Sequence, residues 1–222
     1  MNMNIVFFVM NGKKREKNYY NLEVKEELSS EETKPKEYVA YPFIEGENVD
    51  LCPTNLDHIK LYTKWVNDSK ARIYARNNRP HTVEDIAKWF EPSESRGLSQ
   101  FLTFEIWHKK DNVPIGTCGY GHINWIDRNA NIFMSIGVPE YWNKKLGTEA
   151  SRLLIDYGFK ELNFHKIYAG IFEPNIGSWK VAEKDGFILE GVKRKAIFID
   201  GEYVDSRKYR MLKKDWLKNQ LI

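Results

Sequence analysis

Residues 143–148, with the sequence NKKLGT, combine groups that can bind a phosphate. They separate an apolar, β-branched run that ends near Pro139 from a segment with a helical apolar period, which predicts a strand, a loop and a helix N-terminus. The first N–H groups of a helix lack an internal partner and lie at the positive end of its dipole. Thr148 adds a hydroxyl, and Lys144 and Lys145 add charge. The junction favours a pyrophosphate, although loop lysines are commonly just solvated.

Two strands and the helix between them must position this junction. The runs NANIFMSIGV at 129–138 and HKIYAGIFEP at 165–174 predict the strands. The helix that starts at Gly147 carries an apolar face made of Ala150, Leu153, Leu154 and Tyr157. Because a helical crossover joins the two strands, we expect them to lie side by side and parallel. After the second strand, Asn175 predicts the cap of a short helix on which Ser178 and Ala182 share one face.

The remaining elements complete one α/β domain over residues 41–222. We expect earlier strands at 43–52, 101–108 and 113–125, a helix at 53–66, and a second helix capped by Thr82 and Asp85. Asn and Asp residues at 109–112 and 126–129 predict the turns between the later strands.

The strand at 113–125 has two unusual features. It contains Gly116, Gly119 and Gly121, and glycines within a strand often mark a bulge or a close approach. His122 follows them and is either a base or, as is commoner for a single histidine beside Trp125, a structural residue.

Composition limits the broad class of protein. The chain has 222 residues, 42% hydrophobic, with 34 basic and 31 acidic side chains, so nothing indicates a nucleic-acid partner. Cys52 and Cys118 have no CxxC partner, which predicts buried thiols in a reducing, cytoplasmic setting and no metal site. The apolar run near the start is far shorter than the roughly 20 residues that span a bilayer, so we expect no membrane partner. Residues 1–40 have the charged composition of a poorly ordered extension, with a partner-docking segment as the alternative.

Five blocks of sequence, in order, resemble the GNAT acetyltransferases, and in particular the branch with the ribosomal-protein N-terminal and polyamine acetyltransferases. The blocks are WVND (65–68), IG..EYW.K..GTEA (136–150), LNFHKIYAGIFEPN (162–175), EKDGFILEGV (183–192) and DGEYVD (200–205). The resemblance implies the GNAT fold, a mixed and mostly antiparallel sheet of about seven strands with a splayed parallel pair and four helices. It also implies acetyl-CoA as the co-substrate.

The resemblance assigns roles to residues of this chain. Ser178, in the pattern N-x-x-S, is the expected proton donor to the leaving thiolate, although a helix serine that bonds a carbonyl is an equal alternative. The acceptor wall is expected from Trp65, Asp68, Arg79, Trp89 and Tyr203, for which core packing or plain exposure is the alternative. The cofactor is expected to bind Ile136, Gly137, Val138, Trp142, Asn143, Lys144, Lys145, Leu146, Gly147, Thr148 and Asn175.

The chain also departs from the family pattern. Relatives often carry a glutamate base where this chain has Asn131, a tyrosine at Ala182, and glycines at Asn143 and Lys145. A lysine at the last position would be strained by about 1 kcal/mol.

We therefore expect an acetyl-CoA-dependent N-acetyltransferase in which a primary amine attacks the thioester directly. A protein N-terminal amine, a polyamine and an amino sugar stay open as acceptors. The alternative is a catalytically degenerate GNAT fold that binds CoA or an acyl-CoA as a regulatory module. Many relatives pair through sheet edges or the C-terminal hairpin, so the resemblance implies a homodimer as one possible assembly.

Overall fold

The computed structural model describes residues 38–75, 77–90 and 98–220. Residues Glu37–Ile222 form one compact unit. The predicted N-terminal extension, residues 1–40, lies outside the described residues except for its last three. Of these, Tyr38 packs edge-on against the ring of His58, with ring centroids 5.0 Å apart. The contacts of the compact unit therefore begin slightly before the predicted boundary.

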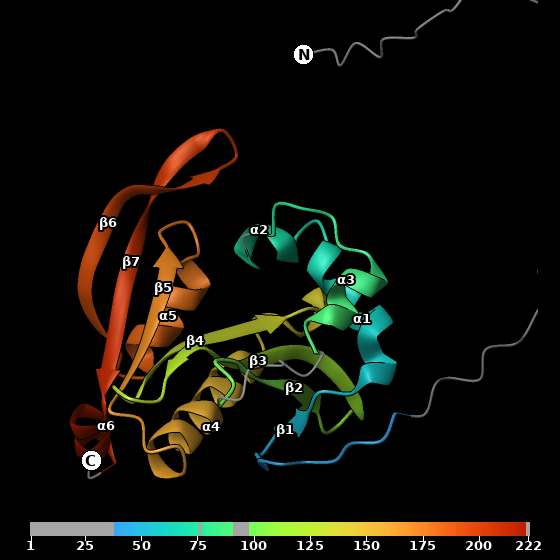
Figure 1. Cartoon of the computed structure of the whole chain (residues 1–222), viewed down its shortest axis with the longest axis horizontal. Coiled ribbons are helices and arrows are strands. Elements are labelled where there is room, and N and C mark those ends of the chain that lie inside the picture. Colours follow the sequence, from blue (N-terminus) through green and yellow to red (C-terminus); the bar gives the residue numbers. More distant parts are fainter. Residues whose placement is uncertain (1–37, 76, 91–97, 221–222) are drawn as a thin grey trace, which may run out of the picture. The chain divides into compact units, whose positions relative to one another are not determined.

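Seven strands form one sheet, as predicted (Figure 1). They are β1 (Val49–Pro53), β2 (Leu102–His108), β3 (Val113–Asn124), β4 (Asn129–Ile136), β5 (Lys166–Phe172), β6 (Ile188–Ile199) and β7 (Glu202–Leu212). Their order is β1-β2-β3-β4-β5-β7-β6, and β4 with β5 is the parallel pair in this sheet. Both predicted hairpin turns and the parallel pairing are confirmed.

The first strand is shorter than predicted. A strand was expected at 43–52, but β1 begins at Val49. The residues before it fold back, because the N–H groups of Phe43 and Ile44 both donate to the Leu51 carbonyl. The Gly46 N–H is held by the Asp50 carboxylate at 2.9 Å, which closes this turn.

The described residues contain six α-helices where four were expected. They are α1 (Ile59–Asn67), α2 (Ala71–Ala75), α3 (Val83–Lys88), α4 (Leu146–Lys160), α5 (Ile176–Lys184) and α6 (Lys213–Asn219), with short 3-10 turns at Leu56–His58 and Pro139–Tyr141. The predicted capping box of Thr82 and Asp85 begins α3. The two unexpected helices depend on local and tertiary contacts: Asp68 accepts N–H bonds at the start of α2, and Trp216 of α6 packs on Phe159 of α4.

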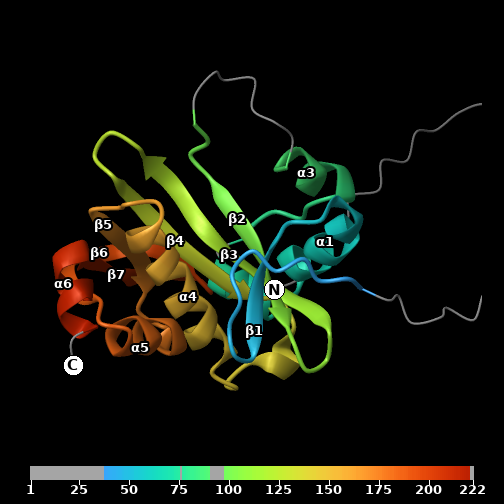
Figure 2. The same ribbon diagram turned by 90° about the horizontal axis from the view of Figure 1, so that it is seen from below.

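The sheet separates two layers of helices (Figure 1, Figure 2). On one face α4 packs centrally, and the Tyr120 hydroxyl of β3 donates to the Leu154 carbonyl of α4. On the other face α1 contacts β2 through Tyr62 and Glu105. Two apolar clusters result, a large one under α4 and α5 and a small one around Ile59, Tyr62, Trp65 and Ile86.

The cysteines are buried free thiols, as predicted. Burial raises the pKa of Cys52 to about 11 and raises that of Cys118 further. No helix in the described ranges is long and apolar enough to cross a membrane.

Candidate functional site

The parallel pair of strands opens after a short common start. β4 and β5 pair at Asn129 with Lys166, Ala130 with Ile167 and Asn131 with Tyr168, and the ladder then ends. β5 stays paired with β7 over its full length, so it is β4 and β5 that diverge, as Figure 1 shows. This confirms the predicted splay. It leaves the rest of β4 without a strand on that side, from Ile132 toward the loop that follows.

Most backbone polar groups at residues 136–138 already form hydrogen bonds within the protein. The Gly137 N–H donates to the Ile115 carbonyl at 2.9 Å, and the Val138 carbonyl accepts the Tyr141 N–H at 3.0 Å. The Ile136 carbonyl accepts the Trp142 indole N–H at 2.8 Å, so Trp142 supports this strand. Within the described residues the Val138 N–H has no acceptor, and it is the open donor of the predicted cofactor strand.

The loop between β4 and α4 adopts the backbone that the predicted phosphate site requires. Asn143 and Lys145 have φ values of 61° and 64°, in the left-handed region. Asparagine tolerates this conformation, whereas lysine is strained by about 1 kcal/mol. Lys145 is the N-cap residue of α4 and no side chain caps the helix, so its first N–H groups, at Leu146, Gly147 and Thr148, face the loop.

Lys144 is exposed, but its ammonium group contacts an aromatic ring. Its ammonium lies 5.1 Å from the centre of the Tyr141 ring, within cation–π range. The Tyr141 hydroxyl donates to Asp111 at 2.7 Å, and this bond is the main reason that the pKa of Tyr141 is raised to about 12. The ring is thus held in place beneath one of the two loop lysines.

Glu149, in the first turn of α4, is a structural residue that our sequence analysis missed. Its carboxylate accepts the Asn48 N–H at 2.7 Å, the Asn48 side-chain amide at 2.9 Å and the Val49 N–H at 3.2 Å. Partial burial disfavours its charged form, but these bonds outweigh it, so the pKa of Glu149 lies below its usual value. Glu149 therefore ties the start of β1 to the helix that carries the phosphate loop.

On α5, the predicted cap is present. The Asn175 side chain accepts the Ser178 N–H at 3.3 Å, and the Ser178 side chain is exposed. Ala182 is buried on the same helix. Tyr209 of β7 is buried and donates to Glu183 on α5 at 2.8 Å, which makes it structural.

Five residues were predicted for the acceptor wall, and the structure spreads them widely. Trp65 is buried on α1 and packs directly on Gly137 of the predicted cofactor strand. Asp68 caps α2. Arg79 is exposed, Trp89 is exposed beside His81, and Tyr203 is exposed beside Phe198 on the β6–β7 hairpin. Among the described contacts, Trp65 alone joins this set to the cofactor strand, and its buried indole N–H has no partner there.

A buried carboxylate stabilises the α1 wall, and no sequence signal pointed to it. Glu105 of β2 is 1% exposed. It bonds His58 Nδ1 at 2.6 Å and accepts the Tyr62 hydroxyl, and Tyr62 in turn accepts the Asn55 N–H at 2.9 Å. Burial, and then the bond to Glu105, raise the pKa of Tyr62. This network connects α1 to the sheet close to Trp65.

Residues 49–188 match the family described as the acetyltransferase (GNAT) domain. This chain belongs to the GNAT acetyltransferase family. Its fold, the splayed strand pair and the loop before α4 all agree with that assignment. The members of this family are acyltransferases.

Individual GNAT relatives match smaller parts of the chain. The probable N-acetyltransferase YjcK of Bacillus subtilis (strain 168) is 44% identical over 72 residues, which cover 32% of this chain and 40% of that protein. The spermidine N(1)-acetyltransferase of Escherichia coli (strain K12) is 37% identical over 93 residues, 42% of this chain and 50% of that protein. The chain thus matches half or less of the length of these two relatives.

A solved GNAT structure confirms the fold over a longer range. The spermidine N-acetyltransferase from Vibrio cholerae, in complex with CoA and spermine, has a TM-score of 0.70 and 22% identity. The similarity covers 78% of this chain and 99% of that one. At this identity the likeness concerns the fold alone.

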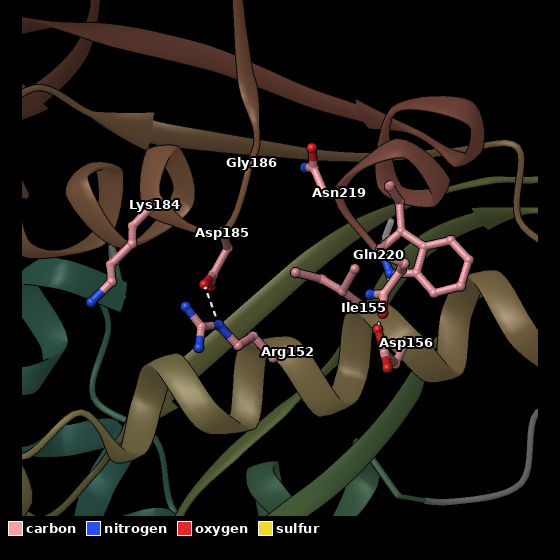
Figure 3. Close-up of a pocket in the computed structure, with 9 residues that line it drawn as sticks. Arg152, Ile155, Asp156, Lys184, Asp185, Gly186, Asn219 and Gln220 are labelled. Atoms are coloured by element: carbon pink, nitrogen blue, oxygen red, sulfur yellow. Dashed lines mark hydrogen bonds and ion pairs between the residues drawn. The ribbon is translucent and has the colours of Figure 1, made fainter. Parts of the chain in front are cut away.

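A cavity of about 500 Å³ lies away from this GNAT site (Figure 3). It is formed by α4, the end of α5 and α6, and none of the predicted cofactor residues lines it. Asp185 at its wall pairs with Arg152 at 2.9 Å, and burial raises the pKa of Asp185 against the lowering effect of that arginine. Over the described ranges, no group of three or more His, Cys, Asp or Glu side chains is arranged to hold a metal ion.

Proposed function

We propose that this chain is an acetyl-CoA-dependent N-acetyltransferase that acetylates a primary amine. The observation that supports the proposal is the opening between β4 and β5, which leads from the last strand pair at Asn131 and Tyr168 to the uncapped N-terminus of α4. A long, thin co-substrate with a phosphate at one end fits an opening of this form.

Different residues of the chain bind different parts of acetyl-CoA in this proposal. The N–H groups at residues 146–148 and the lysines before them bind the pyrophosphate. The Val138 N–H donates to an amide carbonyl of the pantetheine arm, because it lies on the strand beside the opening and has no acceptor of its own among the described residues. The thioester then points toward the narrow end of the opening, since the phosphate end occupies the wide one.

Ser178 acts in this proposal as the proton donor to the leaving sulfur. Its side chain is exposed on the helix that follows β5, and the Asn175 cap fixes the turn that presents it. Ser178→Ala is expected to lower kcat more than it raises the KM for acetyl-CoA, while Ser178→Thr, which keeps a hydroxyl, retains most of kcat. An unchanged kcat in Ser178→Ala would assign the proton donor elsewhere.

The acceptor is proposed only as a class of amine. Asp68 and Asp85 on the α1–α3 wall accept backbone N–H groups at helix starts and keep further acceptor sites on their carboxylates. The wall therefore leaves a protein N-terminal amine, a polyamine and an amino sugar as acceptors.

A thiol-release assay with acetyl-CoA tests the proposal. It compares a panel of N-terminal peptides, spermidine and amino sugars, with mass spectrometry of each acetylated product. Release with one class of amine supports the proposal and names the acceptor class. Tight CoA binding by calorimetry, without release for any amine, would favour the alternative of a CoA-binding module, which the losses at Asn131 and Ala182 make a real competitor.

A further inference from the structure

A bulge in β3 changes the direction of the side chains at its end. The pairing of β3 with β4 is regular up to Gly121 opposite Asn131, then shifts and resumes at Asn124 opposite Asn129. His122 lies within this irregularity with φ of 51°, a left-handed value. A bulge inserts one extra residue into a strand and can re-aim the side chain there.

The buried residues on either side show which way His122 is turned. Tyr120 and Ile123 both belong to the large core cluster that packs under α4. In a regular strand, residues three apart point to opposite faces, so both can point inward only if Gly121 and His122 together occupy the outer face. His122 is accordingly exposed, whereas Ile123 is buried.

Phe101 supports the same assignment. Its ring lies 3.1 Å from the position that a Cβ on Gly121 would take, and its centroid is 5.7 Å from the His122 ring. Residues directly opposite in an antiparallel pair share a face, so this is also the face on which the Asn131 side chain lies. The imidazole and the Asn131 amide therefore lie on the same face of the sheet, the α1–α3 face, one residue apart in the β3–β4 register.

The position of His122 on this face matters for catalysis because Asn131 and Tyr168 form the last residue pair before β4 and β5 diverge. The narrow end of the opening, where the proposed function places the thioester, lies beside them. An amine in solution is mostly an ammonium ion, and it must lose a proton before it can attack. The Asn131 amide cannot accept that proton.

We propose that His122 is the general base of this enzyme, acting directly or through one water on the ammonium group of the acceptor. The inference rests on the proposed function. The imidazole takes one ammonium proton, and the freed amine lone pair forms the C–N bond to the acetyl carbon. The C–S bond breaks and its electron pair leaves with sulfur, which takes a proton from the Ser178 hydroxyl, and Ser178 regains a proton from the second N–H of the nitrogen. His122 then returns its proton to solvent.

Charged and titratable groups also lie on the elements that adjoin His122. Asp127 and Arg128 lie in the β3–β4 turn, and Lys166 and Tyr168 lie on the paired part of β5. Asp127 accepts the Asn124 side-chain amide at 2.8 Å, and Lys166 pairs with Glu190 at 2.8 Å. The described residues that lead into β2, Leu98 to Phe101, carry no titratable side chain.

The test compares His122→Asn with the wild type. Asparagine adopts left-handed backbone angles readily and has no titrating nitrogen, so it keeps the bulge and removes the base. We expect kcat/KM to fall by about 100-fold, the lower limit for loss of a general base. In the wild type, log kcat/KM should bend downward on the acid side of the pH profile, and this bend should be absent from the variant.

A second variant separates chemistry from structure. His122→Gly also tolerates the positive φ and leaves space for an added base, so free imidazole should restore part of its activity. His165→Asn, a change at an exposed histidine immediately before β5, serves as the matched control and should keep wild-type kinetics. Melting temperature and CoA affinity are measured for every variant.

The outcomes distinguish this inference from the proposed function. An active wild type with unchanged kinetics and pH profile in His122→Asn would overturn the inference alone. A bend that persists in His122→Asn, or the absence of imidazole rescue in a folded, CoA-binding His122→Gly, would do the same. A wild type that binds CoA but acetylates no amine would instead overturn the proposed function.

Discussion

Gly137→Ala should destabilise this protein although the change adds one methyl group. Gly137 has an ordinary backbone conformation, so alanine introduces no strain in φ. The added Cβ, however, would lie 2.1 Å from Trp65 Cγ, 2.5 Å from Cδ2 and 2.6 Å from its Cβ. Ordinary carbon contacts are about 3.5–4.0 Å, so the indole or β4 would have to move by more than about 1 Å.

The magnitude follows from how tightly the indole is held. Trp65 is 6% exposed and packs with Ile59, Tyr62 and Ile86, so it cannot move into solvent without opening that cluster. Overpacking of this kind costs about 1–3 kcal/mol. For a chain of this size, 2 kcal/mol corresponds to a fall in Tm of about 4–8 °C. CoA affinity should also fall, because Gly137 directly follows β4 and belongs to the segment that we propose as the binding site of the cofactor.

Urea denaturation and calorimetric titration with CoA measure these two effects. Gly177→Ala is the matched control, since nothing lies within 4 Å of its added Cβ and alanine favours the helix, so it should stabilise by up to about 1 kcal/mol. A double variant with Trp65→Leu should lose less unfolding free energy than the sum of the losses in the two single variants, because the smaller leucine side chain leaves room for the methyl group that Gly137→Ala adds. Wild-type stability in Gly137→Ala, or strict additivity in the double variant, would refute the packing argument.

Three further predictions concern the loop, the first turn of α4 and the buried carboxylate. Lys145→Gly relieves about 1 kcal/mol of backbone strain but raises the conformational entropy of the unfolded chain, so the free energy of unfolding should change by less than about 1 kcal/mol. The variant should bind CoA several-fold more weakly than the wild type at low salt. Equal Kd values for the two proteins at low salt would exclude a contact between Lys145 and a phosphate. The lowered pKa of Glu149 means that its stabilising effect is present above its unfolded pKa of about 4.3 and is lost as pH falls through the folded value. Glu149→Gln should therefore flatten the fall in unfolding free energy below about pH 4.5, measured by urea denaturation at several pH values, and an unchanged slope would contradict this. Tyr62→Phe removes a donor to buried Glu105 and an acceptor for the Asn55 N–H, so it should cost about 1–3 kcal/mol of unfolding free energy, and a neutral result would mean that water replaces the hydroxyl.

Local sequence signals predicted most of the elements. Period and capping identified α4 and the start of α3, because a helix start depends on side chains within one turn of it. The same signals missed α6, a short helix whose buried tryptophan packs on Phe159 of α4, 57 positions earlier in the chain. The first strand was predicted too long for a similar reason, because folding back at Gly46 depends on a bond to Asp50 that alternation does not reveal.

The amino-acid sequence by itself determined the order of elements, the strand-loop-helix junction at residues 143–148 and the parallel pair beside it, since each depends on short-range periodicity and on chain connectivity. The tertiary structure decided which residues meet at the site. Trp65 reaches Gly137, Glu149 reaches Asn48 and Glu105 reaches His58 only after folding, across separations of 47 to 101 positions. The face of His122 was also decided by the fold, because one extra residue in β3 reverses the face of every side chain beyond it. That reversal depends on the pairing with β4, which composition and spacing do not specify.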